Sequence, residues 1–157
     1  MEGVIEDPVA WTFWGWGGCA MALTIANLGS AYGTAKSGMG IASMAVTRPH
    51  LAFKSIIPVI MAGILSIYGL ITAVLISQTV KGEDDKAGPA ISARAWCAGL
   101  VCGFSQLAAG YAIGLVGESG VRCFAMNESI FMALVLILIF AEVLGLYGMI
   151  VAIILQL

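Results

Sequence analysis

The chain has 157 residues, of which 61% are hydrophobic and 10% are charged, and its formal net charge is −2. Its mean hydropathy of +1.01 lies outside the usual range of soluble globular domains, so lipid is the expected solvent. A nucleic-acid partner is excluded, because the chain has no basic patch to neutralise phosphates.

Four apolar stretches follow one another along the chain, each long enough for a membrane-spanning helix of about 20 residues. They cover residues 11–46, 53–80, 90–126 and 129–157. We therefore expect an all-α integral membrane protein of four helices. Its predicted parts are an acidic amino-terminal segment 1–10, a first helical hairpin 11–80, a charged loop 81–89 and a second helical hairpin 90–157.

The amino terminus carries acids and no basic run, so we expect no cleavable signal peptide. The four cysteines lie inside apolar stretches and form no CxxC pair, which favours buried packing residues over zinc ligands or disulfides. They are Cys19, Cys97, Cys102 and Cys123.

The links between the helices indicate an orientation. Pro49 disfavours helical geometry at Arg48 and so ends the first helix, whereas Pro58 predicts a kink in the second. Basic residues gather at the two hairpin tips, and most acids lie at the amino terminus and in the middle loop. The basic residues are Arg48, His50, Lys54 and Arg122. The positive-inside rule then places the tips in the cytoplasm and both termini in the lumen.

The two halves of the chain repeat each other. Residues 64–73 align with 143–152 at an offset of 79, and residues 29–33 align with 110–114 at an offset of 81. Each copy contains two spans, so both copies keep the same orientation in the membrane. Duplication of one helical hairpin is the economical explanation.

Small side chains form a stripe along the first and third helices. The stripes are Ala22, Ala26, Gly29, Gly33, Ser37 and Gly40, and Gly99, Gly103, Gly110, Gly114 and Gly117. Small residues let helix backbones approach closely in lipid, so these two helices should pack in a crowded interior with the bulkier second and fourth helices outside. Such a chain is wedge-shaped, and wedges related by rotation close into a ring. A monomeric or dimeric four-helix bundle is the alternative.

One carboxylate lies at mid-bilayer depth. Glu142 has thirteen residues before it from Ser129 and fifteen after it to Leu157. A charge at this depth costs roughly 2.5 to 3.5 kcal/mol on insertion scales, so it is rarely carried without a purpose. We expect the carboxyl to be protonated in lipid and to ionise beside water or a cation, as reversible proton carriage requires. The alternative is a permanently protonated carboxyl in a structural hydrogen bond.

The counterpart of Glu142 in the first copy is Gly63 (142 − 79 = 63), which predicts one proton site per chain. Tyr68, Phe140 and Tyr147 are candidate neighbours of this site, with Tyr68 favoured as a hydrogen-bond donor. Lys36 and Glu118 could form an ion pair, or each could extend separately toward the membrane interface.

Several segments resemble the proteolipid (c) subunits of vacuolar-type proton-translocating ATPases. They are residues 26–38, 48–49, 54–59, 67–70 and 136–142. The resemblance implies that Glu142 is protonated and deprotonated as a homo- or hetero-oligomeric ring of such subunits turns against an arginine-bearing stator (a) subunit. The hairpin tips would face the central-stalk (d) subunit, and the membrane would be that of a vacuole or another acidic compartment.

The resemblance also implies a rotor subunit that is not itself an enzyme, because ATP hydrolysis occurs in other subunits. The sequence is consistent with this, since it lacks a phosphate-binding GxxxxGK[ST] loop. The first and third helices would line the inside of the ring, and the second and fourth its outside. Residues implied in ring packing are Gly29, Gly33, Gly110 and Gly114.

Relatives that carry sodium add polar ligands on the second helix and a glutamine on the third. The corresponding positions here are Ile64, Leu65 and Ile113. Sodium would lack oxygen ligands beyond Glu142 and Tyr68, so a proton is the expected transported ion, with no metal and no other cofactor.

Two other classes of protein fit the sequence less well. A small drug/proton antiporter also has four helices and a buried glutamate, but that family places the carboxylate in its first helix and shows no hairpin duplication. A tetraspan junctional or pore-forming protein would tolerate Glu142→Gln, whereas a proton-carrying rotor would not.

Overall fold

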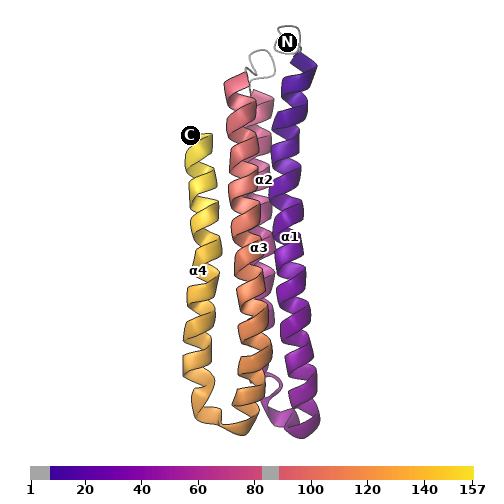
Figure 1. Ribbon diagram of the computed structural model, residues 1–157, viewed down its shortest axis with the longest axis vertical. Coiled ribbons are helices and arrows are strands. Elements are labelled where there is room, and N and C mark those ends of the chain that lie inside the picture. The colour runs from indigo at the N-terminus through magenta and orange to yellow at the C-terminus, as the bar shows by residue number, and fades with distance from the viewer. Residues whose placement is uncertain (1–7, 83–88) are drawn as a thin grey trace.

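The computed structural model describes residues 8–82 and 89–157, and in these ranges the chain forms four long α-helices. They are α1 (Pro8–Thr47), α2 (Ile57–Gly82), α3 (Pro89–Met126) and α4 (Phe131–Gln156). The helices run side by side, and α1 begins at the end of the molecule where α4 finishes (Figure 1). The predicted all-α fold is confirmed, while the predicted acidic segment and charged loop fall mostly on residues 1–7 and 83–88, outside the described residues.

Short 3-10 turns connect the helices within each hairpin. Pro49–Leu51 and Lys54–Ile56 link α1 to α2, and Glu128–Ile130 links α3 to α4. Arg48 has φ −138° and ψ 77°, outside the helical region, because the following proline clashes with a helical residue before it. At the second link, the Asn127 side chain accepts a hydrogen bond of 3.1 Å from the backbone N–H of Ser129.

The predicted kink at Pro58 is wrong. Pro58 is the second residue of α2. The first N–H groups of a helix have no partner within it, so a proline there removes no hydrogen bond and does not bend the helix. The helix begins at Ile57 rather than at the start of the apolar stretch, because Lys54–Ile56 forms a separate 3-10 turn.

The first and third helices form the most extensive contact in the molecule, as the stripes of small residues predict. A Cβ atom added to Gly29 would lie 2.5 Å from the carbonyl oxygen of Gln106, and one added to Gly33 would lie 2.8 Å from that of Gly110. A Cβ on Gly114 would approach the Cα of Gly33 to 3.2 Å. These glycines therefore allow backbone-to-backbone packing within one chain, and their role in packing between chains stays a prediction.

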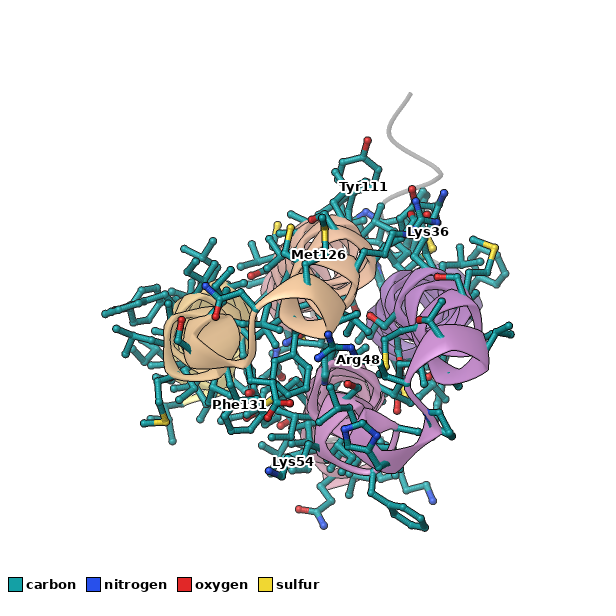
Figure 2. The ribbon with its side chains drawn as sticks, turned by 90° about the horizontal axis from the view of Figure 1, so that it is seen from below. Lys36, Arg48, Lys54, Tyr111, Met126 and Phe131 are labelled. Carbon is teal, nitrogen blue, oxygen red and sulfur yellow. The ribbon has the colours of Figure 1, made fainter. Side chains whose placement is uncertain are left out.

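The other two helices cover this central pair. Seen from the hairpin tips, α3 lies between α1 and α4, and α2 packs on one side of the pair (Figure 2). Tyr111 and Lys36 point from the opposite side. Many bulky side chains on α2 and α4 are exposed, as expected of a lipid-facing layer. They include Ile60, Ile67, Leu70, Leu136, Ile137 and Leu144.

Three helical segments in the described part of the chain are long and apolar enough to cross a membrane: Lys54–Lys81, Pro89–Met126 and Glu128–Gln156. The 40-residue α1, which carries many small residues and the charged Lys36, is not among them. It nevertheless packs along α3. Its packing therefore supports a fourth span that hydropathy alone does not identify.

Candidate functional site

Glu142 lies near the middle of α4, as the twelfth of its 26 residues. Its side chain is half-buried, while the flanking residues Leu138, Ala141 and Gly145 on the same helix are buried. Small residues at 141 and 145 let α4 approach its neighbours closely here. The carboxyl is therefore placed at the boundary between the packed interior and the outer surface of the chain.

The nearest polar partner of this carboxyl comes from the other repeat. The phenolic O–H of Tyr68 on α2 donates a hydrogen bond of 3.3 Å to Glu142 Oε1 on α4. Of the three candidate neighbours, the structure thus brings Tyr68 to the carboxyl. Phe140 and Tyr147 point outward, with 65% and 58% of their surface exposed, and their part in the site stays a prediction.

An apolar layer lies beside the carboxyl on the side of the hairpin tips. Leu65 and Ile113 are fully buried and pack in one cluster with Leu138 and Ala141 of α4. With the half-buried Ile64, they occupy the positions at which sodium-carrying relatives have polar ligands. None of these three side chains offers an oxygen to a cation.

Gln106 is a polar residue near the site that the sequence analysis missed. It lies on α3, is fully buried, and donates a hydrogen bond of 2.9 Å from Nε2 to the carbonyl of Gly145 on α4. Its neighbour Ser105 donates a bond of 2.7 Å to the carbonyl of Leu144. It is the one glutamine in the third apolar stretch, on the face of the small-residue stripe, and this signal could have identified it.

Lys36 and Glu118 do form an ion pair, with 3.4 Å between Lys36 Nζ and Glu118 Oε2. Glu118 also accepts a bond of 2.8 Å from Arg122, one helical turn further along α3. Along α3, Glu118 lies twelve residues, about three turns of helix, beyond Gln106, which contacts α4 three residues after Glu142. It therefore belongs to the end of the bundle where the hairpin tips lie.

The arrangement around Glu142 can hold a single proton. A carboxyl with one phenol donor and apolar neighbours accepts or releases a proton without any further ligand. Among the residues that the structure describes, no three histidine, cysteine, aspartate or glutamate side chains gather as a metal site would require. The chemistry that this carboxyl and phenol offer is the binding and release of a proton.

Known proteins match this chain along almost its whole length. The sequence profile of the family described as the ATP synthase C subunit matches it twice, at residues 17–76 and 96–155, which reproduces the duplication. The 16 kDa proteolipid c subunit of the V-type proton ATPase of Rattus norvegicus is 52% identical over 156 residues, covering 99% of each chain. The c' subunit of the V-type proton ATPase of Saccharomyces cerevisiae is 51% identical over 152 residues, covering 97% of this chain and 92% of that one.

Proposed function

The chain belongs to the ATP synthase C subunit family, and on that premise we propose that it is a proton-translocating proteolipid of the membrane sector of a V-type ATPase. The observation that carries the proposal is the carboxyl of Glu142, placed mid-helix in α4 and hydrogen-bonded to Tyr68. The chain itself hydrolyses nothing. It converts rotation driven by ATP hydrolysis in other subunits into proton movement.

Glu142 is the proton carrier in this proposal. While the carboxyl faces lipid it stays protonated and neutral, because an ionised carboxylate there lacks solvation. Tyr68 occupies one carboxyl oxygen and so keeps the group from lying unpaired. Beside a cationic side chain or water the ionised form is stabilised, and the proton leaves.

The proposed partners follow from the same mechanism. Copies of this chain or of similar proteolipids form a ring, an arginine-bearing stator (a) subunit supplies the cation that releases the proton, and a central-stalk (d) subunit binds the hairpin tips. The exposed bulky side chains of α2 and α4 support contact with lipid or with the stator on the outside of the ring. The half-buried position of Glu142 supports access from that side.

The transported ion in this proposal is the proton rather than sodium. Sodium needs several oxygen ligands, and Ile64, Leu65 and Ile113 supply none. Labelling of Glu142 by a lipid-soluble carbodiimide tests the choice, since the reagent attacks the protonated carboxyl. Labelling at a rate independent of sodium supports a proton site, and slower labelling with added sodium contradicts it.

The proposed location is the membrane of an acidic compartment, with the hairpin tips in the cytoplasm and both termini in the lumen. The structure is compatible with this topology, because α1 begins and α4 finishes at one end of the bundle and both short links lie at the other (Figure 1).

The experiment that tests the assignment is replacement of the resident proteolipid. Membranes from cells that lack their own V-type ring proteolipid are supplied with this chain, and ATP-dependent acidification of sealed vesicles is measured. The proposal predicts that acidification returns when the chain is present. A chain that inserts into the membrane and assembles with the rest of the complex, yet restores no acidification, overturns it.

A further inference from the structure

We propose that Gln106 is a positioning residue. It fixes the orientation of α4 about its own helix axis and so keeps the Glu142 carboxyl against Tyr68. The inference rests on the proposed function and deepens it, because it identifies what holds the proton-carrying side chain in place. Gln106 itself makes no hydrogen bond to Glu142 among the described residues. It acts through the backbone of α4.

The contact between Gln106 and α4 lies next to the carboxyl. Its Nε2 donates to the carbonyl of Gly145, three residues after Glu142, so the two positions share one side of α4. Ser105 binds the preceding carbonyl, that of Leu144. Two adjacent side chains of α3 therefore donate hydrogen bonds to two adjacent backbone carbonyls of α4. These two bonds restrict rotation of α4 about its own axis.

The same side chain also connects to the helix that carries Tyr68. Gln106 Nε2 lies 3.9 Å from Cys102 Sγ, and the Cys102 thiol donates to Thr72 Oγ1 at 3.2 Å. Thr72 in turn donates to the backbone carbonyl of Tyr68 at 3.0 Å. Hydrogen bonds thus join α4 to α3 and α3 to α2. The bond between Tyr68 and Glu142 joins α2 to α4, so each pair of these three helices is connected.

Glycine residues on α4 leave room for these two hydrogen bonds. A Cβ added to Gly145 would lie 2.5 Å from Gln106 Oε1, and one added to Gly148 would collide with Ser105. Glycine at both positions therefore lets the polar side chains of α3 reach the α4 backbone. A larger side chain at 145 would displace the amide.

The first repeat, which has no carboxylate, lacks the two corresponding hydrogen bonds between helices. The counterpart of Gln106 is Ile25 (106 − 81 = 25), which has no polar group. The counterpart of Ser105 is Thr24, whose hydroxyl binds Ala20 on its own helix at 2.8 Å rather than a neighbouring helix. In the first repeat the counterparts of Gln106 and Ser105 therefore make no hydrogen bond to another helix, although Cys19 donates one to the Ala73 carbonyl on α2.

The buried amide of Gln106 lowers the stability of the folded chain. Its Oε1 atom is buried and finds no hydrogen-bond partner among the described residues. A buried acceptor without a partner destabilises the folded state, so an apolar side chain would pack here at lower cost. The donor bond to Gly145 is the role that an apolar side chain cannot fill.

The test is a double-mutant cycle on the assembled complex, with the rate of carbodiimide labelling of Glu142 as the readout. Gln106→Met keeps the length of the side chain and removes its donor, and Tyr68→Phe removes the phenol. Each single substitution should speed labelling by about fivefold, the factor that one hydrogen bond is worth. The double variant should label no faster than the faster single variant, because both substitutions break one arrangement.

The control is Gln78→Met, which removes an exposed amide from α2 and should leave the rate unchanged. If Gln106→Met prevents assembly, Gly145→Ala displaces the amide while keeping it in the chain, and it should give the same acceleration. Labelling of Gln106→Met at the unchanged rate, or effects that multiply in the double variant, overturns the inference alone. Failure of the unchanged chain to label at Glu142 contradicts the proposed function as well.

Discussion

Tyr68 on α2 and Glu142 on α4 are joined by a hydrogen bond of 3.3 Å that connects the two repeats of the chain. This distance exceeds the usual O–H···O separation of about 2.7 to 2.8 Å. The bond therefore shields the carboxyl from lipid without holding it tightly. In the proposed function this carboxyl exchanges a proton in each rotation of the ring, and a weak partner allows it to leave.

Tyr68→Phe should slow proton pumping without abolishing it. The ring of phenylalanine fills the same space, so assembly is retained, and one weak hydrogen bond accounts for about a fivefold effect or less. The initial rate of ATP-driven acidification, divided by the amount of assembled complex, measures the change. Tyr111→Phe is the matched control, because Tyr111 is largely exposed on α3 and is not a candidate neighbour of Glu142. Complete loss of pumping in Tyr68→Phe would contradict a modest supporting role.

Gly110→Ala should destabilise the chain, whereas Gly38→Ala should not. A Cβ added to Gly110 would collide with the backbone of Gly29 on α1, whereas a Cβ added to Gly38 meets nothing within 4 Å. Overpacking of this kind costs about 1 to 3 kcal/mol, while alanine at an open helical position gains up to about 1 kcal/mol. The thermal denaturation midpoints of the purified variants in detergent compare the two. Equal midpoints would contradict the close packing of α1 on α3.

Glu118→Gln should lower stability slightly and leave pumping intact. The substitution leaves Lys36 and Arg122 without their shared carboxylate, and partly exposed pairs contribute about 0.2 to 1 kcal/mol each. The loss should shrink in high salt, which screens such pairs. Lys36→Gln combined with Glu118→Gln should recover part of it. Loss of pumping by Glu118→Gln in an assembled ring would instead give this cluster a part in transport.

Cysteine labelling tests the orientation of the bundle. In a variant whose natural cysteines are replaced by alanine, His50→Cys and Ala90→Cys place exposed thiols at opposite ends of the helices. A membrane-impermeant maleimide added to sealed vesicles with their cytoplasmic face outward should label His50→Cys and spare Ala90→Cys. The reverse pattern would contradict the orientation that the positive-inside rule predicts.

Much of the fold was predictable because a helix that crosses lipid needs a long apolar sequence, and helices that pack closely in lipid need small residues at their contact. Apolar stretches and stripes of small residues predicted four helices and the α1–α3 contact. The matching segments at offsets of 79 and 81 predicted the two hairpins. The error at Pro58 arose because its effect depends on where the helix begins, and the 3-10 turn at Lys54–Ile56 moved that start by a few residues.

The site was predictable only in part. Tyr147 follows Glu142 by five residues, which is about 140° around a helix, so it points in another direction within one chain and its part in the site stays a prediction. Gln106 was not predicted, because the glutamine of sodium-carrying relatives corresponds to Ile113, two turns further along α3. Its bond to Gly145 depends on how closely α3 and α4 approach, which the sequence does not specify.

The measurement that tests the central claim most directly is proton pumping by membranes whose only copy of this chain carries Glu142→Gln. Glutamine keeps the shape of the side chain and cannot titrate, so assembly should persist while ATP-driven acidification is lost. Quantifying the assembled ring in the same membranes separates loss of transport from loss of the complex. Pumping that continues at the rate of the unchanged chain would contradict proton carriage by Glu142 and return its carboxyl to a structural role.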